Sequence, residues 1–373
     1  MNLTSPKPSS RFTRLRKFLI LAAVVFVALR PEPIRALAGV VQSLYRAIGV
    51  SGSFFNAIPK DSQVVTLIGD AGAMTDGVHR ALQAIVEAAP PSQALVYLGD
   101  NIYPNGVPAD AHSVHWRDAH NRLMRQIEPF KAKTGRIYFT PGNHDWENHA
   151  SDGWGAVQRQ TDLINVALGD GHALPARGCP GPVREHLFPN LQILALDSSW
   201  WMHEHRKPSA PHDGCTTLSP EGVLSTLNEM LTTTPSDVET IVILHHPLVE
   251  AGPDPVHTRC PFSPNCPPYA DMRTRLSLVL AKHRPMLCAS GHKHVLEVLK
   301  EAAGCRNYVI SGGASNVHSA PHDPRLLFSQ SALGFMLLHR TSSTPWNLDV
   351  VTVRGDDSFL PMESRVAYST TLQ

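Results

Sequence analysis

The chain has 373 residues, of which 42% are hydrophobic and 17% are charged, so it is long enough to bury a large core and is not disordered throughout. Its 33 Lys and Arg residues balance 32 Asp and Glu residues, which leaves a formal net charge of +1. This balance excludes a protein that is drawn to nucleic acid or acidic surfaces by its overall field. The 20 His residues direct attention to metal chemistry, because His is the commonest metal ligand.

Residues 1–50 are expected to form an export signal or an N-terminal membrane anchor. An apolar run at 18–29 follows five basic residues, which are Lys7, Arg11, Arg14, Arg16 and Lys17. This order is typical of a secretory signal, and Ala36-Leu37-Ala38 offers a cleavage site. The run is shorter than the roughly 20 residues that span a bilayer, but the apolar residues 39–50 could extend it into an anchor. Either arrangement places the body of the chain outside the cytoplasm, in the periplasm or secreted.

Short β-rich apolar runs begin after residue 60 and predict strands that are buried on both faces. In chain order these runs lie at 64–68, 94–98, 136–140, 191–196, 240–244, 285–289, 308–310, 334–339 and 346–353. Helical patterns alternate with the earlier runs, at 75–87, 119–129, 222–231 and 271–282. The sequence therefore predicts an α/β catalytic domain at 60–360 and a C-terminal tail at 361–373. Because no helix separates the runs after residue 300, a second sheet packed on the first is expected.

Three irregular segments interrupt this alternation, at 171–184, 198–214 and 253–268. Long loops in a compact domain are commonly functional, or are insertions that must be held in place. The segment at 198–214 is expected at the rim of a substrate pocket because of its aromatic and imidazole side chains, which are Trp200, Trp201, His203, His205 and His212.

The six cysteines form no Cys-x-x-Cys pair, which argues against a structural zinc site and favours disulfides. Pairing between neighbours in the sequence would give the bridges Cys179–Cys215, Cys260–Cys266 and Cys288–Cys305. Alternatively, Cys288 is a small buried hydrophobic residue inside the apolar run at 285–289. An oxidising compartment would favour the disulfides.

Polar side chains follow five of the predicted strands at the point where each strand ends. The five ends are Gly69-Asp70-Ala71-Gly72, Gly99-Asp100-Asn101-Ile102-Tyr103, Pro141-Gly142-Asn143-His144-Asp145, His245-His246-Pro247 and Gly291-His292-Lys293-His294. A single Gly-Asp after a strand is usually a turn, but turns do not explain five such ends in one chain. In open α/β sheets ligands bind beyond the carboxyl ends of the strands, so one shared site is expected.

The donor types in these ends suit a pair of metal ions. Carboxylate and imidazole groups bind Fe, Zn and Mn, and one carboxylate can bridge two cations about 3.5–4 Å apart. Asp100 is the candidate bridge. His292 and His294 lie two residues apart, so on an extended backbone they would point to the same side, roughly 6–7 Å apart, and each could reach a different ion.

This ordered set of motifs resembles that of the calcineurin-like metallophosphoesterases, and specifically their purple acid phosphatase (tartrate-resistant acid phosphatase-like) branch. Two positions indicate the branch: Gly72 stands where most of the superfamily has a metal-binding His, and Tyr103 stands where purple acid phosphatases have a metal-binding tyrosinate. The resemblance covers residues 64–353, including the late strand and glycine turn at 308–313. It implies a metallophosphoesterase four-layer α/β/β/α sandwich of two mixed sheets flanked by helices.

The resemblance also implies the ligands of two metal ions. A first ion, Fe(III), would be held by Asp70, Asp100, Tyr103 and His294. A second ion, Fe(II), Zn(II) or Mn(II), would be held by Asp100, Asn143, His245 and His292. The pair would bind phosphate oxygens and generate hydroxide from water as the nucleophile. Two other interpretations stay open, in which Tyr103 is a packed aromatic residue and Asn143 caps a helix.

His144 is expected to contact the phosphate or to protonate the leaving oxygen, with Asp145 orienting its imidazole. The branch usually adds a further His after its His-x-Pro motif. Asp254 and His257 fall in that region with a different spacing, and His203 or His205 could substitute. His246 is interpreted as a packing or supporting residue. Five His residues without a motif are interpreted as surface or core residues, namely His112, His115, His120, His149 and His172.

The resemblance thus implies an acid phosphatase-like hydrolase that acts on small phosphate monoesters. No nucleic acid partner is expected, and the N-terminus is the segment through which a membrane attachment would form. Two alternatives stay open. The same site could cleave phosphodiesters or nucleotides, or the chain could be a non-catalytic exported protein that binds metal or a partner.

Overall fold

The computed structural model describes residues 58–249, 251–252, 260, 263–354 and 363–372, all within a compact unit of residues 54–373. The expected export signal or anchor at 1–50 lies outside the described residues, as do Asp254 and His257. Within the described ranges, no helix is both long and apolar enough to cross a bilayer.

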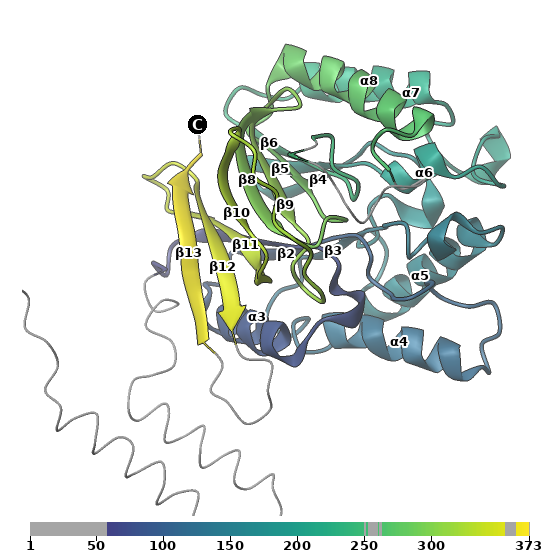
Figure 1. Ribbon diagram of the computed structural model, residues 1–373, viewed down its shortest axis with the longest axis horizontal. Helices are drawn as coiled ribbons and strands as arrows, with labels where there is room; N and C mark the ends of the chain where they lie inside the picture. The colour runs from purple at the N-terminus through teal and green to yellow at the C-terminus, as the bar shows by residue number, and fades with distance from the viewer. Residues whose placement is uncertain (1–57, 250, 253–259, 261–262, 355–362, 373) are drawn as a thin grey trace, which may run out of the picture. The chain divides into compact units, whose positions relative to one another are not determined.

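One mixed sheet has six strands in the order β13-β12-β11-β1-β2-β3 (Figure 1). Strands β1, β2 and β3 are parallel and form one end of this sheet, whereas β11 pairs antiparallel with β1, β12 with β11 and β13 with β12. The bounds are β1 (Gln63–Ile68), β2 (Gln93–Leu98), β3 (Ile137–Thr140), β11 (Leu333–Arg340), β12 (Asn347–Arg354) and β13 (Glu363–Thr371).

The other mixed sheet has seven strands in the order β10-β8-β9-β7-β6-β5-β4. Strands β5, β6, β7 and β9 are parallel, and β4, β8 and β10 pair antiparallel. The bounds are β4 (Val183–Phe188), β5 (Leu191–Ala195), β6 (Glu239–Ile243), β7 (Leu287–Ser290), β8 (Leu296–Ala302), β9 (Cys305–Ser311) and β10 (Leu326–Gln330).

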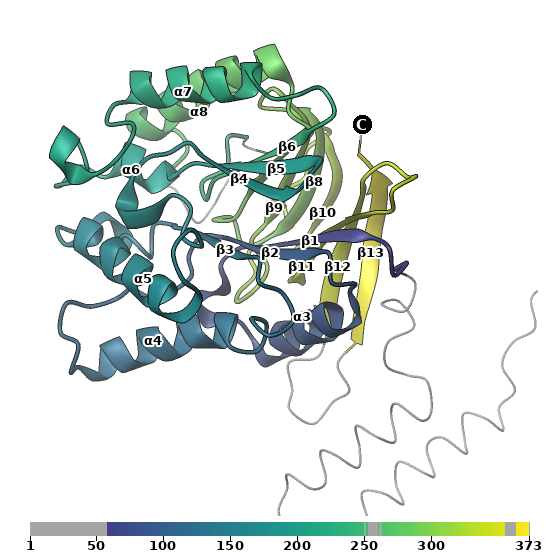
Figure 2. The same cartoon turned by 180° about the vertical axis from the view of Figure 1, so that it is seen from behind.

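The two sheets and the helices form four layers. Because successive side chains of a strand point to opposite faces of the sheet, one set packs between the sheets and the other packs against the helices. Val65 and Leu67 of β1 pack with Ile241 of β6 in the core between the sheets. On the outer faces, Ile68 packs toward α3 (Asp76–Ala88), α4 (Val114–Ile127) and α5 (Gly153–Leu168), and Val242 toward α6 (Ser198–Met202), α7 (Pro220–Thr232) and α8 (Pro267–His283). Figures 1 and 2 show α3 to α5 on one side of the two sheets and α7 and α8 on the other. The predicted fold class, two mixed sheets flanked by helices, is therefore confirmed.

The helices begin where the local sequence provides capping groups. The hydroxyls of Thr75, Ser113 and Ser219 accept hydrogen bonds from backbone N–H groups in the first turns of α3, α4 and α7. Pro220 and Pro267 occupy the first turn of α7 and α8, where a proline costs no helical hydrogen bond.

Some elements lack the signal that predicted the others. Strands β4, β10 and β13 are sheet edges with mostly half-exposed side chains, so they carry no continuous apolar run. Strand β13 pairs with β12 along its whole length, and the tail expected at 361–373 therefore contains an edge strand of the six-stranded sheet. The sequence pattern does not predict helix α5 either, because its apolar residues form no single face: Trp154 and Ile164 pack in two different parts of the core.

Three disulfides join the cysteines that are neighbours in the sequence, as predicted: Cys179–Cys215, Cys260–Cys266 and Cys288–Cys305. Cys288 in β7 is fully buried but is bonded to Cys305 at the start of β9, so the alternative of a free buried thiol is wrong. The first bridge closes a sequence separation of 36 residues around β4, β5 and α6.

Candidate metal centre

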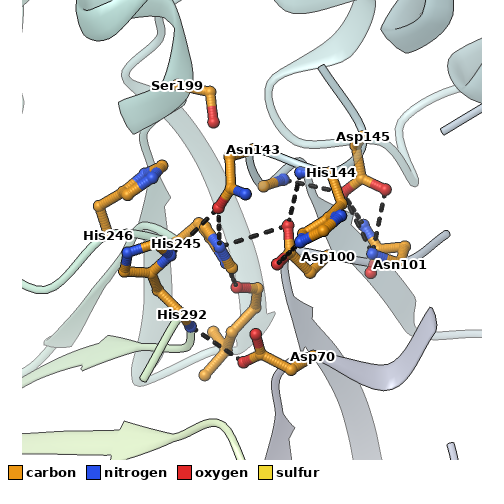
Figure 3. Close-up of polar contacts among 12 residues, drawn as sticks. Asp70, Asp100, Asn101, Asn143, His144, Asp145, Ser199, His245, His246 and His292 are labelled. Atoms are coloured by element: carbon orange, nitrogen blue, oxygen red, sulfur yellow. Dashed lines mark hydrogen bonds and ion pairs between the residues drawn. The ribbon is translucent and has the colours of Figure 1, made fainter. Parts of the chain in front are cut away.

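The side chains that follow β1, β2, β3, β6 and β7 meet in one place, at the carboxyl ends of these strands (Figure 3). The structure therefore brings the five predicted ends together. Hydrogen bonds connect them directly: the His292 backbone N–H donates to Oδ2 of Asp70 at 2.9 Å, and the His144 backbone N–H donates to Oδ1 of Asp100 at 2.9 Å. Asp70, Asp100, Asn143, His245 and His292 are all buried.

One group of side chains surrounds the hydroxyl of Tyr103. This oxygen lies 3.1 Å from Oδ1 of Asp70, 3.1 Å from Oδ2 of Asp100 and 3.0 Å from Nε2 of His294. His294 Nε2 also lies 3.2 Å from Oδ1 of Asp70. These four residues are the ones that the resemblance assigns to a first metal ion.

A second group surrounds the side-chain oxygen of Asn143. This Oδ1 lies 3.1 Å from Nε2 of His245 and 3.1 Å from Nδ1 of His292. His245 Nε2 also lies 3.4 Å from Oδ1 of Asp100. The two carboxylate oxygens of Asp100 are thus divided, Oδ2 toward the Tyr103 group and Oδ1 toward the Asn143 group, which is a placement that suits a bridging carboxylate.

The donor atoms are also divided between the two sheets. Every oxygen donor follows a strand of the six-stranded sheet, namely Asp70, Asp100, Tyr103 and Asn143. Every imidazole donor follows a strand of the seven-stranded sheet, namely His245, His292 and His294. A cation held by this set would therefore connect one sheet to the other.

The hydrogen-bonding arrangement at His245 tests whether the site fits a cation. His245 Nδ1 lies 2.8 Å from the Leu98 carbonyl oxygen, which can only accept, so in the neutral ring Nδ1 carries the proton. Nε2 then turns a lone pair toward oxygens of Asp100 and Asn143, which are also acceptors. Burial disfavours the charged ring, but the Asp100 carboxylate raises the pKa of His245 to about 9. A positive charge at this point is therefore favoured, and the donor set fits a metal ion.

Ligand atoms lie close enough to share an ion in two sets of the described residues. Asp70, Asp100 and His245 form one set and His245, His246 and His292 the other, with ligand atoms within 4.8 Å of one another in each. All five residues are buried. Burial raises the pKa of Asp100, whereas the nearby imidazoles of His245 and His144 lower it. The net effect holds this pKa well below its usual range.

Tyr103 needs a nearby cation to ionise. Burial, followed by the carboxylates of Asp100 and Asp70, raises the pKa of its phenol well above the usual value. For His294, burial opposes the charged ring, but Asp70 raises the pKa.

The backbone at this site is held in an unfavourable conformation. Asp70, Asp100 and His292 have φ values of 60°, 54° and 67°, in the left-handed region that costs residues other than glycine of order 1–3 kcal/mol each. Gly142 allows the chain to approach the centre, because a Cβ there would lie 2.3 Å from Oδ1 of Asp100. The surrounding fold therefore has to hold these residues against the cost of their backbone conformations.

Asp145 does not orient His144, and that prediction is wrong. The Asp145 carboxylate is fully buried and accepts hydrogen bonds from the backbone N–H groups of Gly142 at 2.8 Å, Asn101 at 3.0 Å and Ile102 at 3.0 Å. Figure 3 shows its contacts with Asn101. These hydrogen bonds join the loop after β2 to the loop after β3. The nearest acceptor to Nδ1 of His144 is instead the carbonyl oxygen of Pro104.

His144 lies on the accessible side of the site. Its side chain is 27% exposed, its ring centroid lies 4.3 Å from that of Tyr103, and its Nε2 lies 3.9 Å from Oδ2 of Asp100. Because the Pro104 carbonyl can only accept, it selects the ring form with the proton on Nδ1, which leaves Nε2 facing the candidate metal centre.

Other expected residues are placed away from the substrate side. His203 is 1% exposed and packs between Trp146, at 4.8 Å between ring centroids, and His149, at 5.8 Å, so it is not available to a leaving group. His246 is fully buried, with Nδ1 2.8 Å from Oγ of Ser198 and its ring 4.4 Å from that of His292. The prediction that His246 supports other residues agrees with this contact. Trp200 and Trp201 are buried in and around α6, so they do not form the expected rim.

Two residues near the centre were not singled out from the sequence. The ring of His318 stacks on that of His294 at 4.4 Å, and Asn148 contacts both Asn143 and His144. Neither stands in a motif, and only the folded loops bring them to the site.

This architecture, with metal-type donors at the ends of strands from two stacked sheets, defines a metal-dependent hydrolase. The chain belongs to the calcineurin-like phosphoesterase family, whose members it matches over residues 64–296, more than half its length. The predicted membership of the metallophosphoesterases is therefore confirmed. Comparison with curated protein sequences gives no match.

Three solved structures illustrate the similarity of the fold. GAP50 of Plasmodium has a TM-score of 0.55 and 14% identity, over 84% of this chain and 89% of that one. Purple acid phosphatase PPD1 from yellow lupin (Lupinus luteus) has a TM-score of 0.54 and 16% identity, over 84% of this chain and 54% of the lupin chain. PhoD has a TM-score of 0.56 and 12% identity, over 85% and 72%. At these identities the likeness concerns the fold alone.

Proposed function

We propose that this chain is a phosphohydrolase that cleaves small phosphate monoesters at a dinuclear metal centre. The observation that carries the proposal is the division of the Asp100 carboxylate between two groups of donors, Oδ2 toward Tyr103 and Oδ1 toward His245. Each group offers enough oxygen and nitrogen atoms for one ion, and the shared carboxylate would hold the ions at the spacing that two-metal hydrolases use.

The ligands of each ion follow from this division. The first ion would be held by Asp70, Asp100, Tyr103 and His294, and the second by Asp100, Asn143, His245 and His292. The phenol of Tyr103 favours Fe(III) at the first position, as in the purple acid phosphatase branch, with Fe(II), Zn(II) or Mn(II) at the second. Bound there, the ions supply charge for the phosphoryl oxygens and activate water for attack.

His144 supplies the remaining polar contact on the accessible side. The Pro104 carbonyl keeps a proton on Nδ1, so Nε2 is the atom that meets a substrate. In the charged ring Nε2–H can donate to a phosphate oxygen or give its proton to the leaving oxygen. In the neutral ring Nε2 can only accept a hydrogen bond.

The three disulfides favour an exported location, periplasmic or secreted, because such bonds persist in oxidising compartments. The N-terminal segment at 1–50 would serve as the export signal or as a membrane anchor that keeps the catalytic domain outside the cytoplasm. No part of the proposed reaction involves a nucleic acid.

A non-catalytic role is the second candidate, favoured by one observation: the similar GAP50 chain is described as the anchor in the inner membrane complex of Plasmodium. The full set of donors in this chain, together with a partly exposed His144 beside them, favours turnover. A diesterase would use the same ligands and differ in the space left for a second ester group.

The test combines metal analysis with paired substrates. Purified protein should contain close to two metal ions per chain and release phosphate from a nitrophenyl monoester faster than it cleaves the matching diester. Asp100→Asn should lose metal and activity together. Asp349→Asn is the matched control, since Asp349 is a buried carboxylate of β12 paired with His339 of β11, and this variant should keep both metal and activity. A protein that holds metal and turns over neither ester would be a binding protein instead.

A further inference from the structure

The chain makes an unusual turn directly after the Asn143-His144 pair. Glu147, Asn148 and His149 have φ values of 52°, 52° and 63°, so three successive residues other than glycine lie in the left-handed region. Such runs are rare, because each residue costs roughly 1–2 kcal/mol. Asn is among the residues that tolerate this conformation best, and the backbone N–H of Asn148 returns to the Asn143 carbonyl at 2.8 Å.

The turn brings the side chain of Asn148 against that of Asn143. The Asn143 Nδ2 donates to Oδ1 of Asn148 at 3.1 Å. This contact fixes which end of the Asn143 amide faces the centre: with Nδ2 committed to Asn148, Oδ1 is left toward His245 and His292. An amide can bind a cation only through its oxygen, so the orientation matters for the second ion.

The other end of the Asn148 amide reaches the loop after β2. Its Nδ2 donates to the Pro104 carbonyl at 3.0 Å and to Oδ1 of Asn105 at 2.9 Å, and it lies 3.2 Å from Nδ1 of His144. These two bonds use both hydrogens of the amide, so the proton between His144 and Pro104 belongs to Nδ1 of His144. Asn148 thus fixes the position of the Pro104 carbonyl, which in turn orients the His144 ring.

We propose that Asn148 is the positioning residue of this site, which orients the Asn143 amide toward the second metal ion and fixes the ring of His144 through Pro104. It performs the task that the sequence suggested for Asp145. The inference rests on the proposed function, because it assigns a role toward the same ions and substrate. The positioning role requires one hydrogen-bond acceptor, two donors and a left-handed backbone at a single position, and Asn provides all of them.

Two substitutions separate the two contacts. Asn148→Asp keeps the left-handed turn and an acceptor for Asn143 but removes the donor to Pro104 and Asn105. Asn148→Gly keeps the turn and removes both. Glu147→Gly is the matched control, because it changes a neighbouring left-handed residue whose side chain makes none of these contacts.

Three measurements on the full chain test the proposal: kcat/KM with a monoester at saturating metal, the same value in a His144→Ala background, and metal retained against increasing chelator. Asn148→Asp should lower kcat/KM about 10-fold or more when His144 is present, and less than about 2-fold when it is absent. Asn148→Gly should lower it at least as much and keep part of that loss without His144, because it also releases the Asn143 amide. Asn148→Gly should also lose the second ion at lower chelator, whereas Asn148→Asp and Glu147→Gly should retain it.

The proposal is overturned if either Asn148 variant stays within about 2-fold of the parent, or if the loss is equally large without His144. It is also overturned if both variants and the parent retain metal equally. These outcomes leave the proposed function standing, because the parent protein is still active. An inactive parent would reject the proposed function, and the chelator series, which needs no turnover, would still decide whether Asn148 orients Asn143.

Discussion

At the scale of the residue, Tyr103 connects the proposed metal content to a visible property. Its hydroxyl lies within 3.1 Å of Asp70, Asp100 and His294, while burial and the two carboxylates oppose ionisation of the phenol. Only a strongly charged ion would convert it to phenolate. Iron-loaded protein should therefore show a broad visible absorption band, and Tyr103→Phe should lose it while remaining folded. An unchanged spectrum in the variant would remove Tyr103 from the first metal.

The buried His203 should make the folded protein less stable in acid. Burial, with Lys207 as the next cause, lowers the pKa of His203 to about 4, below the ordinary 6.5 of an unfolded chain. Between these values the unfolded chain binds a proton that the folded chain does not, so stability falls as the pH drops from about 6.5 to 4. His203→Phe keeps a ring against Trp146 and should flatten the acid limb of a Tm-against-pH curve. The same change at the exposed His115 should leave the curve as it was, and equal effects at both positions would contradict this account.

At the scale of the element, the buried Asp145 fastens two loops that carry candidate ligands. Its carboxylate accepts hydrogen bonds from backbone N–H groups of both loops. The side-chain amide of an Asn in its place would direct its own N–H donors at these backbone donors. Asp145→Asn should therefore lower the free energy of unfolding by roughly 2–4 kcal/mol. Denaturant unfolding measures this directly. Asp152→Asn is the comparison, because the Asp152 side chain is 51% exposed and its ion pair with Arg159 should contribute less than about 1 kcal/mol.

The same scale shows where prediction from the sequence succeeds and fails. Strands buried on both faces carry continuous apolar runs, so β1, β2, β6 and β7 and the ligands that follow them could be located. The edge strand β13 lacks such a run because its side chains are half-buried or exposed. The roles of Asp145 and Asn148 depend on loop geometry, above all on three successive left-handed residues, which no periodicity or motif in the sequence encodes.

At the scale of the whole molecule, metal binding and folding should be coupled. The buried donors attract positive charge, and an ion that binds only the folded chain adds stability as its concentration exceeds the dissociation constant, about 2.7 kcal/mol at 100-fold excess. Treatment with a chelator should lower Tm, and addition of Zn(II) or Mn(II) should restore it. Asp100→Asn should show neither response. A chelator-treated protein with unchanged Tm and no bound metal would contradict the coupling.

The separation of oxygen donors on one sheet from nitrogen donors on the other has a consequence for how such a centre could change during evolution. Hard ions prefer oxygen and borderline ions accept imidazole, so substitutions confined to the loops of a single sheet would shift the preference for one element over another. The opposite half of the coordination sphere would keep its shape. Variation of metal selectivity among relatives of this chain could then proceed by small local steps, without rebuilding the core that aligns both halves.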